Sequence, residues 1–305
     1  MLLNRLQIKG FRGFEDLKVE DLRQVNLVIG RNNAGKTSLL EAIYLLCAKV
    51  GSPFAVLSRG ETAPSSILNL FHGRPTIESN AALTIGSDQR QIELSLHRGE
   101  IKWRTNDGVD DSFGLYDPNR YGLAALPVFL EARSDPRFSV PAIWKDIALT
   151  PKEDDIVNCL QLVLPTLERI AVVEGSLIVR LKDVPTPISM ATLGGGVVRL
   201  FYLACALILA ANNICLIEEI EDGVHHTIHE GMWKFIYDVA KRHNIQVFAT
   251  THGLDCLRGF ALASYEVPEV SAQVIRIEER KGQVSPVLFD ERQFQIAAES
   301  EIEIR

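Results

Sequence analysis

The residues from Gly30 to Thr37, GRNNAGKT, have the types and spacing of a loop that binds nucleotide phosphates. Backbone N–H groups of such a loop face phosphate oxygens closely, so glycines are needed at its bends, and the helix that follows directs its positive end at the same phosphates. In this pattern Lys36 would reach the β- and γ-phosphates, and Thr37 would ligate Mg²⁺. A chance string is the alternative, but the loop stands between a predicted strand and a predicted helix. The pattern therefore predicts ATP and Mg²⁺ as cofactors.

Two adjacent acids, Glu218 and Glu219, follow the short apolar run from Ile214 to Ile217. A buried strand of a parallel sheet that ends in two acids places them beside the phosphate loop. We expect Glu218 to hold the Mg²⁺ shell and Glu219 to orient a water molecule for attack. An apolar run that ends in two acids does not by itself indicate a nucleotide site. Together with a phosphate loop in the same chain, it does.

Two further motifs complete the set. The strand-like run QVFATT ends at His252, which suits a sensor of the γ-phosphate, with a structural histidine as the alternative. Residues Thr192 to Gly196, TLGGG, precede a helical run, and glycines at a helix start form a second anion-binding end. A flexible turn is the alternative there. Two phosphate-gripping helix ends in one chain make sense if each serves a different face of one nucleotide.

The elements that position these residues follow from hydrophobic periodicity. Helical spacing indicates helices over 37–46, 151–170, 197–211 and 232–243. Strands are indicated over 2–9, 24–29, 127–130, 177–181, 214–217 and 246–249, with hairpins over 81–104 and 272–289. Residues 51–75 read as irregular and 105–122 as a polar loop. The alternation of strands and helices at both ends predicts an α/β fold.

Bulk properties narrow the class of protein. The chain has 305 residues and a formal net charge of −7, which argues against a surface coated for nucleic acid but allows a local basic groove. Five scattered cysteines without a CxxC pair indicate a reducing compartment, hence a cytoplasmic protein. The first residues lack the apolar core of a signal peptide, and the run 200–211 is too short to span a bilayer. We expect no membrane partner.

The order of phosphate loop, glycine-rich run, acidic strand and strand-plus-histidine resembles the ABC ATPase superfamily. Within it, IKGFRGF, GRNNAGKTSLLEAI, TLGGGVVRL, LIEEIEDGVHH and VFATTH resemble the SMC/RecF-like branch, and most of all the ATPase domain of OLD-type (overcoming lysogenization defect) proteins. The resemblance covers nearly the whole chain and is weakest over residues 51–188. It implies an α/β P-loop head with a mostly parallel core sheet, an antiparallel β subdomain and an inserted helical lobe.

The resemblance also implies roles for individual residues. Glu218 stands where the Walker B aspartate does, Glu219 where the catalytic glutamate does, and His252 where the switch histidine does, with Lys36 also catalytic. Residues 221–225 match the D-loop. The nucleotide-binding set comprises Arg12, Gly30, Asn32, Asn33, Ala34, Gly35, Lys36, Thr37, Ser38, Thr192, Gly194, Gly195 and Gly196, and the metal ligands are Thr37 and Glu218.

One domain is expected over residues 1–290, with a nucleotide-binding core at 1–50 and 190–290, an inserted β/helical lobe at 51–189 and a tail at 291–305. The resemblance implies a homodimer that closes head-to-tail around ATP. OLD-type proteins carry a C-terminal TOPRIM nuclease, and the chain ends too soon after His252 to hold one. The predicted protein is therefore an ATPase subunit that gates a separate nuclease or toxin in DNA repair or antiphage defence.

Several alternatives stay open. Glu218 replaces the usual Asp, so slow hydrolysis or a non-hydrolysing switch is an alternative, and a RecF-like DNA clamp is another. A transporter subunit is disfavoured by the long insertion before the glycine run. His225 and His229 could share a helical face and bind a metal, and Gln89 or Gln91 could belong to a Q-loop. Residues 119–137, which carry Arg120, Arg133 and Arg137, could line a DNA groove, but a solvated face is the favoured interpretation.

Overall fold

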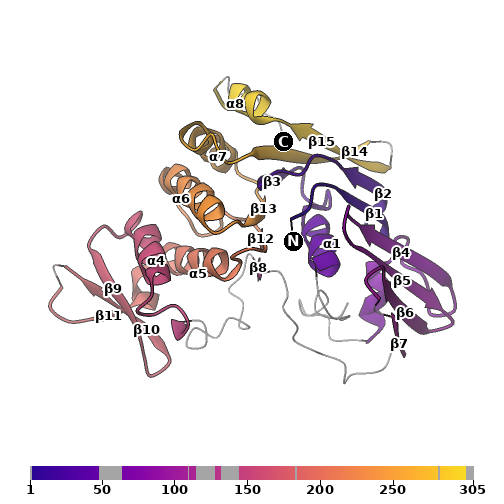
Figure 1. The fold of residues 1–305 in the computed structure, drawn as a ribbon, viewed down its shortest axis with the longest axis horizontal. Helices are drawn as coiled ribbons and strands as arrows, with labels where there is room; N and C mark the ends of the chain where they lie inside the picture. The colour runs from indigo at the N-terminus through magenta and orange to yellow at the C-terminus, as the bar shows by residue number, and fades with distance from the viewer. Residues whose placement is uncertain are drawn as a thin grey trace.

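A six-stranded sheet with the strand order β15-β14-β3-β13-β12-β8 forms the centre of the molecule (Figure 1). The computed structural model describes residues 2–47, 64–108, 110–114, 128–131, 144–182, 184–280 and 282–299. Neighbouring strands from β14 to β8 run parallel, and β15 pairs antiparallel with β14. The strands are β3 (Val25–Ile29), β8 (Val128–Leu130), β12 (Ile214–Ile217), β13 (Gln246–Thr250), β14 (Ala272–Arg280) and β15 (Gln283–Phe289). The predicted mostly parallel core sheet is confirmed.

The three central strands β3, β13 and β12 are buried at every position, as expected for strands covered on both faces. Their side chains alternate between two separate hydrophobic cores. In β12, Cys215 and Ile217 belong to one core, whereas Ile214 and Leu216 belong to the other. Each face of the sheet is thus sealed by its own layer of elements.

An antiparallel sheet and the helix α1 (Lys36–Cys47) cover one face (Figure 1). The sheet has the order β2-β1-β4-β5-β6-β7, which confirms the antiparallel β subdomain. Arg12 in the β1–β2 turn has a positive φ of 49°. The elements of this layer are β1 (Leu6–Phe11), β2 (Phe14–Val19), the 3₁₀ helix η1 (Pro64–Leu70), β4 (Asn80–Gly86), β5 (Gln91–His97), β6 (Glu100–Thr105) and β7 (Asp110–Gly114).

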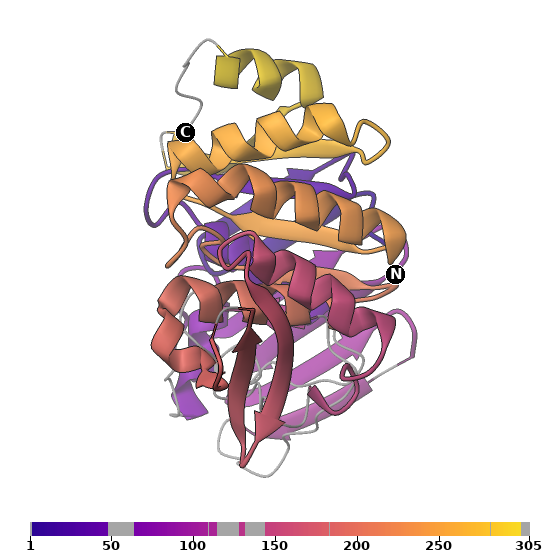
Figure 2. The ribbon, with the colours of Figure 1, turned by 90° about the vertical axis from the view of Figure 1, so that its left-hand side faces the viewer.

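Helices cover the opposite face and lie side by side in Figure 2. They are α5 (Gly195–Leu209), α6 (His229–Arg242), α7 (Leu254–Glu266) and α8 (Glu291–Glu299), with the short 3₁₀ helix η3 (His226–Ile228) before α6. An aromatic cluster joins three of these helices, because Trp233 and Tyr237 of α6 contact Phe260 of α7, which contacts Phe294 of α8.

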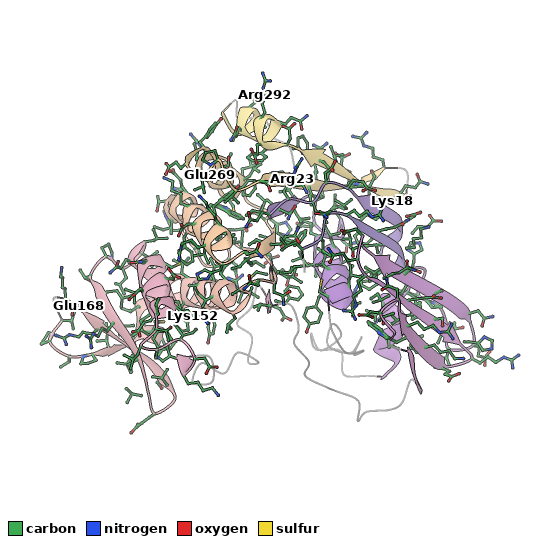
Figure 3. All side chains as sticks on the ribbon, in the orientation of Figure 1. Lys18, Arg23, Lys152, Glu168, Glu269 and Arg292 are labelled. Carbon is green, nitrogen blue, oxygen red and sulfur yellow. The ribbon has the colours of Figure 1, made fainter. Side chains whose placement is uncertain are left out.

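A lobe extends from this helical layer (Figure 1). It contains α4 (Pro151–Gln161), a three-stranded antiparallel sheet of β9 (Leu167–Val173), β10 (Ser176–Leu181) and β11 (Ile188–Ser189), and the 3₁₀ helix η2 (Met190–Leu193). Thr150 caps α4 by accepting a hydrogen bond from the Lys152 N–H. Figure 3 shows Lys152 and Glu168 of this lobe. The lobe leads directly into α5 and so carries the glycine run.

The structure differs from the sequence-based elements at a few places. The helix predicted over 151–170 ends at Gln161, and β9 begins at Leu167, because Pro165 between them cannot continue a helix. The polar loop predicted over 105–122 contains β7, and β2, α7 and α8 were not predicted. The division of the chain into domains stays a prediction, although Phe294 of the expected tail lies in the core.

Candidate functional site

The phosphate loop joins β3 to α1, and its glycines are required by the surrounding backbone. Gly30 has a φ of 142°, and a Cβ there would lie 2.5 Å from the carbonyl oxygen of Ile277 in β14. Gly35 has a φ of 102°, and a Cβ there would lie 2.9 Å from the ring of Phe14. Larger residues at these two positions would reshape the loop. A hollow of about 460 Å³ lies between loop residues 30–34 and the end of β14 at residues 276–280.

Lys36 begins α1 and is 5% exposed. Its ammonium donates hydrogen bonds to the carbonyl oxygens of Gly30 at 2.8 Å and Arg31 at 3.0 Å. Burial lowers the pKa of Lys36, and the charges of Glu219 and Glu221 oppose this shift. The lysine is therefore positioned by its own loop and lies within electrostatic reach of the acids after β12.

Thr37 and Glu218 meet across the gap between α1 and β12. The Thr37 hydroxyl donates to Glu218 Oε1 at 2.5 Å. Two oxygens that bind neighbouring positions of an octahedral Mg²⁺ ion, each at 2.0–2.1 Å, are roughly 2.9 Å apart. This pair needs to open by a few tenths of an ångström to accept the ion, so the donor set fits Mg²⁺. The longer Glu side chain does not prevent Glu218 from reaching Thr37.

Glu219 occupies an unusual backbone conformation, with a φ of 45°. Its N–H donates to the side-chain hydroxyl of Thr250 at 2.9 Å, and Thr250 is 1% exposed. The Glu219 carboxylate lies 3.4 Å from His252 Nε2, and both side chains are partly exposed. The predicted catalytic acid and the predicted switch histidine are thus neighbours at the carboxyl ends of β12 and β13.

Glu221 fixes the backbone that follows β13. Its Oε1 accepts from the N–H groups of His252 at 2.7 Å and Gly253 at 3.0 Å. Glu221 Oε2 is buried and has no hydrogen-bond partner among the residues that the structure describes. This acid holds the His252 segment next to the acidic segment after β12.

The glycine run lies apart from the phosphate loop. Thr192 and Gly194 are exposed, and the Thr192 hydroxyl donates to the Ser189 carbonyl. A Cβ on Gly194 or Gly195 would meet no atom of the described part of the chain within 4 Å, whereas one on Gly196 would lie 2.7 Å from the carbonyl oxygen of Gly223. The run opens α5, which packs on the face of the sheet opposite to α1. The two helices whose first residues are predicted to bind phosphate therefore lie in different layers of the molecule.

Arg12 pairs with α1. Its guanidinium bonds Glu41 through Nε at 2.6 Å and Nη2 at 3.1 Å, and the Glu41 side chain is 3% exposed. Contact of Arg12 with a nucleotide stays a prediction. Asn32, Asn33 and Ala34 lie in the loop, and Ser38 lies in the first turn of α1.

The structure does not support the metal site, the Q-loop or the DNA groove that the sequence left open. His229 is 5% exposed and turns its Nε2 to the Val224 carbonyl at 3.2 Å, whereas the His225 and His226 rings contact each other at a tilt of 38°. Within the described residues, no cluster of three or more His, Cys, Asp or Glu side chains could hold a metal ion. Gln89 and Gln91 lie at the end of β4 and β5 that adjoins the start of β1, away from Phe14 and the phosphate loop. Arg120, Arg133 and Arg137 lie outside the described residues.

Thr250 and Arg199 near the site were not predicted, and Glu221 was predicted only as part of the D-loop. Thr250 ends a strand with a polar side chain, and Glu221 adds a third acid to the acidic run. Arg199 is a charged residue in the otherwise apolar start of α5 and is 9% exposed. Its guanidinium donates to the Glu218 carbonyl at 2.7 Å. A lone charge on a buried helix face is the signal that could have revealed Arg199.

Comparisons with known proteins show which families and proteins this chain is similar to. Residues 1–97 match the family model described as AAA ATPase domain. An uncharacterized protein of Methanocaldococcus jannaschii is 40% identical over 79 residues, which are 23% of this chain and 36% of that protein. An ATP/GTP phosphatase of Helicobacter pylori is 20% identical over 90% of this chain and 89% of that protein. The DNA replication and repair protein RecF of Ligilactobacillus salivarius is 52% identical over 46 residues, 15% of this chain and 12% of that protein.

Solved structures define the class of fold. An SMC head bound to the C-winged helix domain of ScpA aligns with a TM-score of 0.62 and 12% identity, over 95% of this chain and 98% of that chain. A Pyrococcus furiosus SMC head aligns with a TM-score of 0.61 and 10% identity over 99% of both chains. The protein has an α/β ABC ATPase fold of the SMC-head type. Its N-terminal third matches an ATPase domain, and the likeness to OLD-type proteins in particular stays a prediction.

No helix in the described part of the chain is both long enough and apolar enough to cross a lipid bilayer. The five cysteines are free, and burial raises the pKa of the Cys256 thiol to about 12. The cytoplasmic location predicted from the cysteine pattern stays a prediction.

Proposed function

We propose that this protein binds and hydrolyses ATP in a head-to-tail homodimer. The observation that carries the proposal is the convergence of Lys36, Thr37, Glu218, Glu219 and His252 at the carboxyl ends of β3, β12 and β13. In open parallel sheets, ligands bind in the crevice outside these strand ends. The phosphate loop grips the phosphates, Glu219 polarises a water molecule, and His252 reads the γ-phosphate.

The position of the glycine run supports the dimer. The helix α5 packs on the face of the sheet opposite to α1, so the glycine run and the phosphate loop begin helices in different layers of the molecule. The exposed Gly194 and Gly195 leave the N-terminus of α5 open to a phosphate held by a second copy. A two-fold axis would create two such composite sites, each with the phosphate loop of one protomer and the glycine run of the other.

Mixed dimers test this arrangement. Lys36→Ala removes the ammonium from the phosphate loop, and Gly195→Asp places a carboxylate at the glycine run, where the structure offers open space. Each variant alone should lose ATP turnover. Mixed one to one, half of the dimers contain one protomer of each kind, and each of these holds one intact site, so turnover should recover to about a quarter of the wild-type level.

The controls separate folding from function. Lys152→Ala, at an exposed lysine of α4, should leave turnover unchanged. Glu219→Gln should accumulate an ATP-bound dimer, seen as an ATP-dependent increase in mass by light scattering. If the mixture of Lys36→Ala and Gly195→Asp stays inactive although both variants fold, the head-to-tail site is wrong. If Lys36→Ala alone keeps its turnover, the nucleotide site itself is wrong.

We also propose that ATP-driven closure gates a separate effector, a nuclease or toxin, in DNA repair or antiphage defence. Copurification in the presence of ATP and Mg²⁺, compared between wild type and Gly195→Asp, tests this step. A RecF-like clamp is the alternative that the 46-residue match to RecF favours. DNA-stimulated hydrolysis with salt-sensitive binding would support the clamp. A single-turnover assay that detects no hydrolysis would support a non-hydrolysing switch.

A further inference from the structure

Arg199 is a buried charge between the glycine run and the acids. It lies on the first turns of α5, three residues after Gly196, and is 9% exposed. Burial lowers the pKa of its guanidinium, and four surrounding acids, led by Asp222, oppose that shift. A charge buried at the start of an apolar helix is costly unless it has partners, so its contacts indicate its role.

The partners of Arg199 are backbone carbonyl oxygens from two strand ends. Nη1 donates to the Glu131 carbonyl after β8 at 2.5 Å. Nη2 donates to the carbonyls of Glu218 at 2.7 Å and Glu219 at 3.4 Å. The planar guanidinium can serve these oxygens at once because its donors are fixed in a fork. Arg199 therefore fastens the acidic segment after β12 to α5.

The acidic segment needs such fastening. Glu219 has a φ of 45°, a conformation that non-glycine residues avoid. The Thr250 hydroxyl holds its N–H, and Arg199 lies at its carbonyl. Without Arg199, the Glu218 carbonyl would lose its guanidinium donor, the Glu219 carbonyl would keep the Asp222 N–H at 2.9 Å, and the Glu219 carboxylate would be held less firmly near His252.

We propose that Arg199 is a positioning residue for Glu219 of its own protomer, although it stands on the helix whose first residues serve the partner's ATP. This inference rests on the head-to-tail dimer proposed above. One side chain would then join the two composite sites, because α5 grips one triphosphate while Arg199 holds the acid that acts on the other. A nucleotide clamped at one site would steady the catalytic acid of the second site.

Two simpler roles compete with this proposal. Arg199 could support the glycine run, or it could serve the packing of α5 on the sheet. Mixed dimers distinguish all three roles. In a dimer of an Arg199 variant with either Lys36→Ala or Gly195→Asp, only one of the two composite sites keeps both its phosphate loop and its glycine run. Paired with Lys36→Ala, an Arg199 variant supplies the phosphate loop and Glu219 of that site. Paired with Gly195→Asp, it supplies the glycine run.

The variant to test is Arg199→Met, which keeps the length of the side chain and removes its donors. Arg180→Met, at a 67% exposed arginine of β10, is the matched control. With Gly195→Asp, the Arg199→Met protein should restore about a quarter of wild-type turnover, from the mixed dimers alone, whereas Arg180→Met, whose homodimers are also active, should restore about half. With Lys36→Ala, it should restore at least tenfold less than Arg180→Met does, because a small displacement of a catalytic group lowers the rate by factors of ten to a hundred. The Arg199→Met homodimer should show a lower kcat with an unchanged KM for ATP.

The opposite pattern, with activity in the Lys36→Ala mixture and none with Gly195→Asp, would assign Arg199 to the glycine run and overturn the proposal. Equal loss in both mixtures would assign it to packing and overturn it as well. If Arg199→Met does not fold, Arg199→Lys replaces it and should shift the two mixtures in the same directions, because one ammonium cannot reproduce the fork. Failure of the proposed function is recognised separately, since Lys36→Ala mixed with Gly195→Asp would then remain inactive.

Discussion

The hydroxyl of Thr250 should set how well Glu219 is held for catalysis. It accepts the Glu219 N–H at 2.9 Å, at a residue whose φ of 45° is unfavourable for a non-glycine side chain. Replacing Thr250 by Val preserves the volume of a side chain that is 1% exposed but removes the acceptor. The change therefore tests the hydrogen bond without opening a cavity.

The magnitude follows from the cost of an unmade hydrogen bond. A donor left unsatisfied in a buried setting costs about 1–3 kcal/mol. The contacts that hold Glu219 must also outweigh about 1–2 kcal/mol of left-handed strain. A loss of about 1–2 kcal/mol corresponds to a factor of about 5–30 in the population of the bent conformation. We expect Thr250→Val to lower kcat by about that factor and to leave the KM for ATP unchanged, because the phosphate loop is untouched.

Steady-state ATP turnover with Mg²⁺ measures the effect, with Thr250→Ser as the control. Serine keeps the hydroxyl and loses the methyl group, so its kcat should stay within about threefold of wild type, which corresponds to less than 1 kcal/mol. A Thr250→Val enzyme with wild-type kcat would refute the reasoning. An equal fall in the serine and valine variants would also refute it, since the methyl group rather than the hydrogen bond would then be responsible.

Three further outcomes are expected. Burial lowers the pKa of Lys36, so its ammonium destabilises the nucleotide-free protein at neutral pH. This cost fades as the pH rises through the lowered pKa toward 10.5, the ordinary pKa of lysine. Urea titrations should therefore show Lys36→Met to be more stable than wild type at pH 7, with the difference gone by pH 10.5. Gly196→Ala should cost about 1–3 kcal/mol of unfolding free energy, because its Cβ would lie 2.7 Å from a carbonyl oxygen, whereas Gly195→Ala, with open space, should be nearly neutral. Asp155→Asn should lower the free energy of unfolding by about 1 kcal/mol, because this 13% exposed acid pairs with an arginine of α6 at 2.9 Å. The difference should be smaller in high salt, and chemical unfolding at two salt concentrations measures both effects.

The parallel core was predictable because its strands are short apolar runs that end in polar residues. The run from Ile214 to Ile217 ends at two acids, and the strand β13 ends at Thr250, two residues before His252. Buried strands hold few polar side chains, and those present are hydrogen-bonded, as Asn26 of β3 is, so consecutive polar residues after an apolar run mark the edge of the sheet. The phosphate loop was predictable for the same reason, since its glycines follow directly after β3.

Other features depend on contacts between residues far apart in sequence. Arg199 bonds the Glu131 carbonyl, 68 residues away, and nothing local indicates this partner. The helix α8 is short and mostly polar, and its burial depends on Phe294 reaching the aromatic cluster of α6 and α7. The misjudged helix over 151–170 had a local signal, Pro165, which periodicity alone overlooks.

The positions of the two acids show why pattern alone could not assign the site. Side chains of β12 alternate between the two cores, and continued alternation would send Glu218 toward α1 and Glu219 toward the opposite face under α5. Glu218 follows the rule and meets Thr37. Glu219 does not, because its φ of 45° ends the strand, and its carboxylate instead lies beside His252 and within electrostatic reach of Lys36. The left-handed bend is therefore what brings both acids to one edge of the sheet, and the side chains that hold the bend should matter for turnover as much as the acids do.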